Sequence, residues 1–173
     1  MLRPATDGDV ETIRRWRNHP KVRRASFTTH EIGPEEHRAW WEAVSADPTR
    51  RVLIFERNGV PSGVVLFTGV GSELVEWSKY VDVDGLGSER AAAWEELEYE
   101  AIDYAFDVLG ADRIGASTLA ANTPVRRLHE RTGFVELRRY TRTIDGVDRE
   151  VVWSELSARA WKARRTRRET AGE

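Results

Sequence analysis

The stretch Ile114–Phe134, IGASTLAANTPVRRLHERTGF, carries the strongest indication of how this chain folds. It opens with a short β-prone run, Ile114–Leu119. Thr123 and Pro124 then mark a helix start, because threonine is a good N-cap and proline fits the first helical position. A helix of two to three turns follows and is closed by Gly133, after which a new strand begins. The stretch therefore predicts a strand, a short helix and a second strand.

Two interpretations of this stretch are open from its spacing alone. A strand that opens into a helix can hold an anionic ligand at the helix N-terminus, where backbone N–H groups are unpaired. Asn122 lies at the junction, and arginines follow along the helix. An ordinary strand–helix–strand connection has the same pattern, and spacing alone favours this simpler interpretation.

Length and composition exclude several classes of protein. The chain has 173 residues, which is enough for one domain with a core. No segment approaches the roughly 20 apolar residues of a membrane helix, and the polar start MLRPATDGDV is unlike a signal peptide. The absence of cysteine excludes disulfides and thiolate chemistry, and a net charge of −2 gives no basic field for nucleic acid. We expect a cytoplasmic protein without membrane or nucleic-acid partners.

The first half of the chain predicts two helices among hairpin-connected strands. Asn58-Gly59 is a strong two-residue hairpin turn. The segment Glu73–Val83 alternates, so it predicts a strand with two distinct faces. The expected elements are a strand over Leu2–Thr6, a helix ending near Asn18 before the break at Pro20, a helix from about Ile32 to Asp47, and strands over Arg51–Arg57, Val60–Thr68 and Glu73–Val83.

The second half predicts a β–α–β unit and a final hairpin. A glycine loop, Asp84–Ser88, precedes the longest helix, Glu89–Leu109, whose glutamates (Glu95, Glu96, Glu98, Glu100) we expect to form a solvated face. Strands over Val135–Ile144 and Arg149–Leu156 flank the turn at Asp145-Gly146. We expect one domain over residues 1–160 and a basic, flexible tail over residues 161–173. The order of elements predicts an α/β (α+β) fold with a mixed sheet and helices on both faces.

The order and its landmarks resemble the GNAT superfamily of acetyl-CoA-dependent N-acetyltransferases. LAANTPVRRLHERTGF is similar to the family segment in which an Asn contacts the pantetheine arm and a short helix carries the Tyr or His of LYEKxGF or LHExxGF. LRPAT with Asp9, the hairpin NGVPSGVVLF and the loop DGLGS are weaker matches singly, and the resemblance covers nearly the whole chain. It implies a mostly antiparallel sheet in which two strands, Glu73–Val83 and Ile114–Leu119, splay apart.

Two subfamilies resemble the N-terminal region. WRNHPKVRR followed by IGPEEHRAWW is similar to nucleotide-linked amino-sugar N-acetyltransferases of the pseudaminic-acid type, and to Rim-type enzymes that acetylate protein N-termini. The EEH-x-x-WW element and the DYAF-x-x-LG run favour the sugar group. The basic segment around WRNHPKVRR is interpreted either as a lip that binds an anionic acceptor or as a solvated helix face.

The resemblance implies acetyl-CoA as co-substrate and no metal, and His19, His30 and His37 show no metal-ligand pattern. Pyrophosphate binding needs unpaired N–H groups and close backbone approach, which favours the loop at Gly85–Ser88. The family has a long hydrogen-bond donor where this chain has Asp82. A second alignment of the chain with the family places the pyrophosphate site at Arg90–Glu95. In that alignment Ala92 and Trp94 stand where the family has glycines. The expected cofactor-binding residues are Val81, Asp82, Val83, Gly85, Gly87, Ser88, Arg90, Asn122 and Arg127.

The implied chemistry is direct attack of an amine on the thioester carbonyl. An alkylamine has a pKa of about 10 and must lose a proton to a base. Glu76 is the candidate base, with a surface glutamate as the alternative. His129 stands at the position of the family's general-acid Tyr, although a histidine with a reference pKa of about 6.5 is mostly neutral at pH 7.5. It is expected either to act as the acid or to hydrogen-bond the thioester sulfur or the backbone.

The acceptor stays open at this level. The expected substrate-binding residues are Trp16, Arg17, Asn18, Ser78 and Tyr80. The first hypothesis is a small-molecule amine, such as a nucleotide-linked amino sugar, and the second is a protein N-terminus, an amino acid or an antibiotic amine. The third is a non-catalytic GNAT-fold binding protein, because fold does not fix function. A monomer and a homodimer both agree with the sequence.

Overall fold

The structure is a computed structural model that describes the backbone of residues 1–171 and the side chains of residues 1–167. The strands are β1 (Leu2–Pro4), β2 (Arg50–Arg57), β3 (Val60–Thr68), β4 (Leu74–Val81), β5 (Arg113–Leu119), β6 (Val135–Ile144) and β7 (Val147–Ser157). The α-helices are α1 (Val10–Asn18), α2 (Pro20–Arg24), α3 (Pro34–Ala46), α4 (Val83–Leu86), α5 (Arg90–Asp103), α6 (Thr123–Thr132) and α7 (Ala158–Ala171). Short turns η1 (Asp7–Asp9) and η2 (Gly87–Glu89) precede α1 and α5, and a π-helical turn, η3 (Tyr104–Val108), continues α5.

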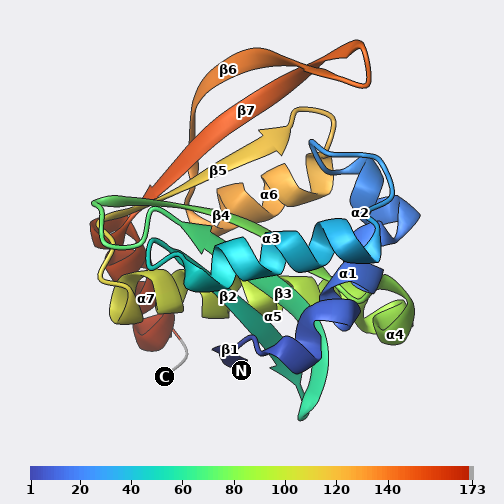
Figure 1. Ribbon diagram of the computed structural model, residues 1–173. Coiled ribbons are helices and arrows are strands. Elements are labelled where there is room, and N and C mark those ends of the chain that lie inside the picture. Colours follow the sequence, from blue (N-terminus) through green and yellow to red (C-terminus); the bar gives the residue numbers. More distant parts are fainter. Residues whose placement is uncertain (172–173) are drawn as a thin grey trace.

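The strands form a single seven-stranded sheet in the order β1-β2-β3-β4-β5-β7-β6 (Figure 1). All neighbouring pairs are antiparallel except β4 and β5, which are parallel. β4 pairs with β5 only at Leu74–Arg113, Val75–Ile114 and Glu76–Gly115. On its other side β4 pairs with β3 as far as Val81. The two central strands therefore separate after Glu76, and the predicted mixed sheet with a splayed pair is confirmed.

The backbone of β4 presents polar groups to the gap that this separation opens. The N–H of Asp82 donates to the carbonyl of Ser62, at the β3 side, with an N···O distance of 2.9 Å. Because N–H directions alternate along a strand, the N–H groups of Val81 and Lys79 point the other way, toward β5. These groups have no opposing strand, since the β4–β5 pairing ends at Glu76.

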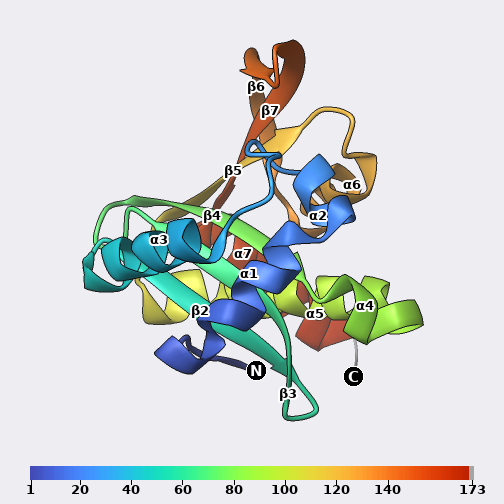
Figure 2. The same cartoon turned by 45° about the vertical axis from the view of Figure 1, so that its right-hand side comes forward.

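Helices cover both faces of the sheet, as the sequence predicts. α1 and α3 lie on one face, and α5 and α7 lie on the other (Figures 1 and 2). The alternation of β2 shows the reason: Val52 and Ile54 pack with α1 and α3, whereas Leu53 and Phe55 join the cluster around α5. β2 is thus buried on both sides, which accounts for its continuous apolar run.

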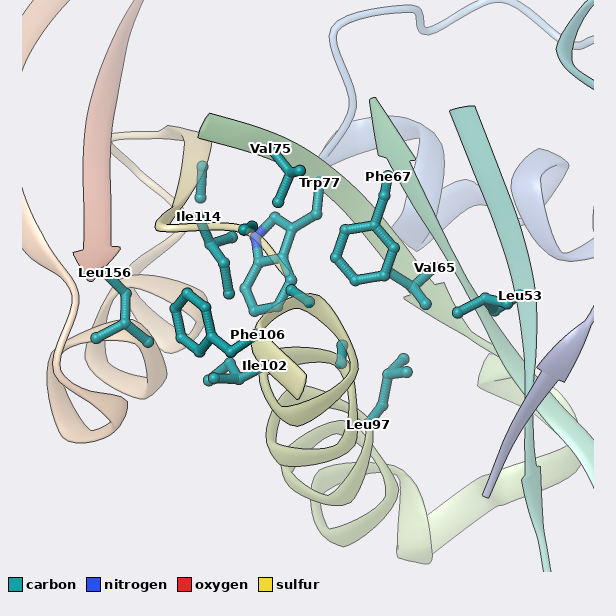
Figure 3. Close-up of a cluster of buried hydrophobic side chains, with 14 of the residues drawn as sticks. Leu53, Val65, Phe67, Val75, Trp77, Leu97, Ile102, Phe106, Ile114 and Leu156 are labelled. Atoms are coloured by element: carbon teal, nitrogen blue, oxygen red, sulfur yellow. The ribbon is translucent and has the colours of Figure 1, made fainter. Parts of the chain in front are cut away.

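The larger core lies between the sheet and α5. Figure 3 shows Trp77 of β4 between Phe67 and Ile114, above Leu97 and Ile102 of α5. Apart from Trp77, which is 8% exposed, these side chains have no exposed surface. This core packs β4 against α5. Trp77 also contacts His129 of α6 and Phe134, so α6 lies on the same side of the sheet as α5.

Local signals in the sequence locate most element boundaries correctly. Asn58 and Gly59 form the predicted hairpin turn with φ of 53° and 77°. Pro20 was predicted only to break a helix, but it also starts α2, whose first turn is capped by the ring of His19, with the N–H of Lys21 donating to Nδ1 at 3.1 Å.

The C-terminal segment differs from the expected frayed tail. Residues 158–171 form α7, and Trp161 is only 4% exposed. The indole of Trp161 donates to Asp103 at 2.7 Å, and Arg165 donates to Asp107 at 2.8 Å. The prediction is therefore corrected for residues 161–171, because an apolar anchor and acidic partners on α5 and η3 order this basic segment. Residues 172–173 lie outside the described residues.

Over residues 1–171, no helix combines the length and the apolar character that crossing a bilayer requires.

Candidate active site

A cavity of about 970 Å³ occupies the gap between β4 and β5. The loop after α2, β4, the first turns of α5, β5 and α6 line it, together with Arg142 from β6. Figures 1 and 2 both place α2 beside α6 at this opening. The missing hydrogen-bonded pairing between the two central strands is therefore what creates the site.

The alternation of β4 divides this cavity into two ends. Ser78 and Tyr80 point to the face that carries α1, whereas Trp77 and Lys79 point to the face that carries α5. We call the first the α2 end, lined by Arg17, Lys21, Phe27, Ser78, Tyr80 and Arg142. We call the second the α5 end, lined by Trp77, Lys79, Arg90, Trp94, Glu95, Asn122, Arg127, His129 and Arg131.

Cations dominate the α2 end. The Nη2 of Arg17 donates to the carbonyl of Thr28 at 2.8 Å, while its Nη1 is buried without a hydrogen-bond partner among the described residues. Burial lowers the pKa of Arg17 from its ordinary value, yet a guanidinium stays charged in proteins. The guanidinium of Arg142 lies 4.6 Å from the ring centre of Phe27. No carboxylate from the described part of the chain lines this end.

A contact beside the lining residue Thr28 joins distant parts of the chain. The hydroxyl of Thr29, in the loop after α2, contacts the carboxylate of Asp145 at the tip of the β6–β7 hairpin. Tyr80 lines the α2 end, and burial raises the pKa of its hydroxyl well above the ordinary value. Tyr80 therefore stays a neutral phenol that can donate a hydrogen bond.

A buried ion pair lies beside the α5 end. The Nζ of Lys79 is 2.6 Å from the Oε2 of Glu98, and both side chains are nearly or fully buried, with exposures of 3% and 0%. Lys79 also lies over the rings of Trp77 and Trp94, at 4.2 and 5.2 Å from their centres. The expectation that Glu98 belongs to a solvated face is corrected by this contact. The available signal was Lys79, a charge on the apolar face of an alternating strand.

His129 projects from α6 into the same region. Its ring is 4% exposed, stacks on Phe134 at 4.7 Å between centres, and places Nε2 3.8 Å from the Oε1 of Glu98. Burial, and next the charge of Lys79, hold the pKa of His129 well below its ordinary value. His129 is therefore a neutral imidazole near pH 7.

Asn122 ends the connection from β5 and is the N-cap of α6. Its side chain makes no cap hydrogen bond, and its carbonyl accepts from the N–H of Arg126 at 3.2 Å. The amide therefore stays available toward the cavity that Asn122 lines. Gly133 closes the helix with φ of 103°, a conformation that favours glycine.

Comparison with known proteins assigns this architecture. A family model described as an acetyltransferase (GNAT) domain matches residues 1–135. The chain belongs to this family. A curated relative, acetyltransferase PseH of Campylobacter jejuni, is 25% identical over 128 residues, which are 73% of this chain and 76% of that protein. The resemblance inferred from the sequence is confirmed.

Solved structures show the same GNAT fold. Spermidine N-acetyltransferase from Vibrio cholerae, in complex with CoA and spermine, superposes with a TM-score of 0.81 at 20% identity, covering 93% of this chain and 96% of that one. YncA from Salmonella typhimurium, with acetyl-CoA, gives a TM-score of 0.70 at 24% identity, covering 91% and 92%.

The glycine loop that the GNAT resemblance assigned to pyrophosphate is a helical turn in this chain. The Oδ1 of Asp82 accepts the N–H of Gly85 at 2.9 Å and so caps α4. A Cβ on Gly85 would lie 2.3 Å from the Oδ2 of Asp82, and Gly87 has φ of 50°. Local backbone geometry therefore accounts for both glycines without a phosphate.

The cavity instead extends to Arg90–Glu95, the second position considered for the pyrophosphate site. Asp82, Gly85, Gly87 and Ser88 lie outside its lining, whereas Arg90, Ala91, Trp94 and Glu95 line it. Asp82 already accepts one of the N–H groups that the pyrophosphate was expected to bind, and the placement of the pyrophosphate at Gly85–Ser88 stays a prediction. Val81, Val83 and Arg127, which are also among the expected cofactor-binding residues, line the cavity.

Three other expected site residues lie outside the lining. Trp16 is 3% exposed in the core under α1. The side-chain amide of Asn18 binds the backbone of Ile32 twice, donating to its carbonyl and accepting its N–H at 2.8 Å each, so it holds the loop before α3. Glu76 is exposed on the face shared with Ser78, at the last position where β4 pairs with β5. Within the described residues, no group of three or more side chains is arranged to hold a metal ion.

Proposed function

We propose that this GNAT protein transfers the acetyl group of acetyl-CoA to a primary amine of a small molecule that also carries negative charge, such as a nucleotide-linked amino sugar. The observation that supports this most is the cationic α2 end, where Arg17, Lys21 and Arg142 line the cavity without a carboxylate. Guanidinium groups bind phosphate in charge-assisted, often bidentate, hydrogen bonds. Arg17 brings a buried and unpartnered Nη1 to this end, which a phosphate oxygen would satisfy.

Charge argues against a polyamine acceptor. Seven arginines and lysines line the whole cavity, against Glu95 as the one carboxylate from the described residues. A polycation entering the α2 end would meet like charges in a partly buried site, where screening by salt is weak. The structural neighbour from Vibrio cholerae holds spermine, but that likeness extends to the fold only.

The chain's own groups fit direct transfer. The amine enters at the α2 end and the thioester at the α5 end, and the gap between β4 and β5 joins the two ends. The N–H groups of Val81 and Lys79 point into this gap and would polarise the thioester carbonyl. As the C–N bond forms, the C–S bond breaks and the thiolate leaves.

Two side chains would assist the reaction, one by accepting the amine proton and one by stabilising the leaving thiolate. Glu76, on the strand face of Ser78 and Tyr80, would accept the amine proton through water. His129 is neutral, so it would hydrogen-bond the sulfur and would not donate a proton as an imidazolium. This favours the second of the two roles expected for His129.

The test is an amine panel with acetyl-CoA, scored by thiol release. The informative pair is a nucleotide-linked amino sugar and the same amino sugar without its nucleotide, with spermidine as a third acceptor. We expect the nucleotide form to have a kcat/KM at least about 10-fold above the free sugar, because charge-assisted hydrogen bonds contribute about 1.5–3 kcal/mol. A preference for spermidine would exclude the proposed acceptor. If millimolar acetyl-CoA neither raised the Tm nor released thiol, the protein would be a non-catalytic GNAT domain.

A further inference from the structure

The segment from Asp82 to Arg90 is poorly suited to bind a diphosphate. It carries the carboxylates of Asp82, Asp84 and Glu89, and Asp82 already binds the N–H of Gly85. α4, η2 and α5 follow one another directly, so this segment contains no extended loop between α4 and α5. Trp94 also lines the cavity with a bulky ring in the first turns of α5.

Arginine side chains stand on the other wall of the α5 end. Arg127 and Arg131 are four residues apart on α6, which places them on one face of the helix. Both line the cavity, as does Arg90 across from them at the start of α5. The side chain of Arg127 has no hydrogen-bond or ion-pair partner among the described residues. Positive charge is therefore available here from side chains and not from a backbone loop.

Arg131 is held in a contact that is easily exchanged. Its Nη2 lies 3.5 Å from the Oε1 of Glu95 on α5, and the two side chains are 62% and 47% exposed. An exposed ion pair of this kind contributes little stability, about 0–1 kcal/mol. A phosphate that enters between α5 and α6 can therefore replace Glu95 as the partner of Arg131.

We propose, on the basis of the proposed function, that the donor is recognised through the single phosphate of a 4′-phosphopantetheine arm, bound by Arg127 and Arg131 with Arg90, and not through the nucleotide half of CoA. Asn122 and the free backbone edge of β4 border the same cavity and would bind the amides of the arm. The substrate class is a 4′-phosphopantetheine thioester. CoA and an acyl carrier protein both supply this chemistry.

Four acetyl donors test this inference on the whole protein: acetyl-CoA, acetyl-4′-phosphopantetheine, acetyl-pantetheine and an acetylated holo-acyl carrier protein. For each we would measure kcat/KM, and for the three corresponding small thiols the Kd by calorimetry. Acetyl-4′-phosphopantetheine should act within about 3-fold of acetyl-CoA. Acetyl-pantetheine should be weaker by about 10-fold or more, because it lacks the charge-assisted bonds to the arginines.

Variants on α6 assign the effect to side chains. Arg127→Ala and Arg131→Ala should weaken 4′-phosphopantetheine binding about 10-fold and leave pantetheine binding unchanged. Arg126→Ala is the matched control, since its guanidinium is paired with Glu136 at 2.7 Å and Arg126 does not line the cavity. The difference between the two ligands separates a phosphate contact from a general loss of folding.

The possible results distinguish failure of this inference from failure of the proposed function. Acetyl-CoA turnover without use of acetyl-4′-phosphopantetheine would overturn this inference and leave the proposed function standing, as would variants that weaken both ligands equally. Binding of none of the four donors would overturn both. If the phosphopantetheine forms are used, the ratio of kcat/KM between the carrier protein and acetyl-CoA identifies the source of the arm.

Discussion

Lys79 on β4 and Glu98 on α5 form an ion pair with 2.6 Å between Nζ and Oε2, and only 3% and 0% of the two side chains are exposed. The pair lies directly beside the cavity, next to the rings of Trp77 and Trp94. Thr132 adds a hydrogen bond from α6 to Glu98 at 3.2 Å. The contact therefore ties both helices of the α5 end to the strand that borders the gap.

Glu98→Gln should reduce the free energy of unfolding by about 3–5 kcal/mol, because it leaves a buried ammonium without its counter-charge. The double variant Lys79→Met/Glu98→Leu should recover most of this loss, since it removes both charges and keeps apolar volume. Chemical denaturation would measure both. Glu100→Gln on the same helix, whose carboxylate is 39% exposed, is the control and should change stability by less than about 1 kcal/mol. Equal effects at positions 98 and 100 would contradict the buried pair.

The low pKa of His129 predicts a pH dependence of stability. The folded protein keeps His129 neutral, so below about pH 6.5 the unfolded chain binds a proton that the folded chain does not. The contribution is therefore fully present above pH 6.5 and is lost as pH falls, at about 1.4 kcal/mol per pH unit. Urea unfolding at pH 7.5, 6.0 and 5.0 should show a steeper decline for the wild type than for His129→Gln. Parallel declines would show that the histidine is not held neutral.

Arg17 should determine the charge preference for the acceptor. Arg17→Met keeps the apolar stem but removes the guanidinium whose Nη1 is buried and unpartnered. We expect kcat/KM for a nucleotide-linked amino sugar to fall about 10- to 100-fold, while that for the free amino sugar changes little. Arg15→Met, on the same helix and outside the cavity, is the control. A uniform loss for both acceptors would indicate a structural role for Arg17.

Glu76→Gln should lower turnover at neutral pH by about 100-fold, the lower range for removal of a general base. The deficit should shrink at high pH, because an amine with a pKa of about 10 then loses its proton without help. Rate–pH profiles of the wild type and the variant provide the comparison. A constant ratio across the profile would mean that Glu76 does not act as the base.

Trp161 should anchor α7. Trp161→Ala removes an indole that is 4% exposed, packs 5.6 Å from the ring of Tyr99 and donates to Asp103. The expected loss is about 3–5 kcal/mol, as for other buried aromatic residues. Trp40→Ala, a partly buried indole on α3, should cost less. Wild-type stability in Trp161→Ala would mean that α7 does not contribute to the fold.

The sequence contains enough local information for most of the fold. Hairpin turns, such as Asn58-Gly59, and helix stops, such as Gly110 with φ of 68°, act through backbone geometry that the residue itself dictates. Strand alternation correctly predicts two distinct faces for Glu73–Val83, and the structure places Ser78 and Tyr80 on one and Trp77 on the other. The splay of β4 and β5 came from the family resemblance, because no local pattern encodes where pairing stops.

The parts that sequence reasoning missed depend on contacts between distant residues. Glu98 looks like its exposed neighbours until Lys79, 19 positions earlier, is placed opposite it. Gly85 and Gly87 match a phosphate loop in composition, and the sequence did not reveal that Asp82 caps the backbone there. The helix at the C-terminus needed Asp103 and Asp107 as partners. In each case the residue type was visible and its partner was not.

The gap between β4 and β5 also divides the sheet into two halves joined only at the pairs from Leu74–Arg113 to Glu76–Gly115. The amide hydrogens of Lys79 and Val81 face this gap, so in the free protein they should exchange with solvent as those of an edge strand do, although β4 is the central strand of the sheet. A bound amide-containing arm would supply the missing ladder. Capture of such an arm would then be a final step of sheet formation, and slowed amide exchange on β4 would reveal it before any chemistry takes place.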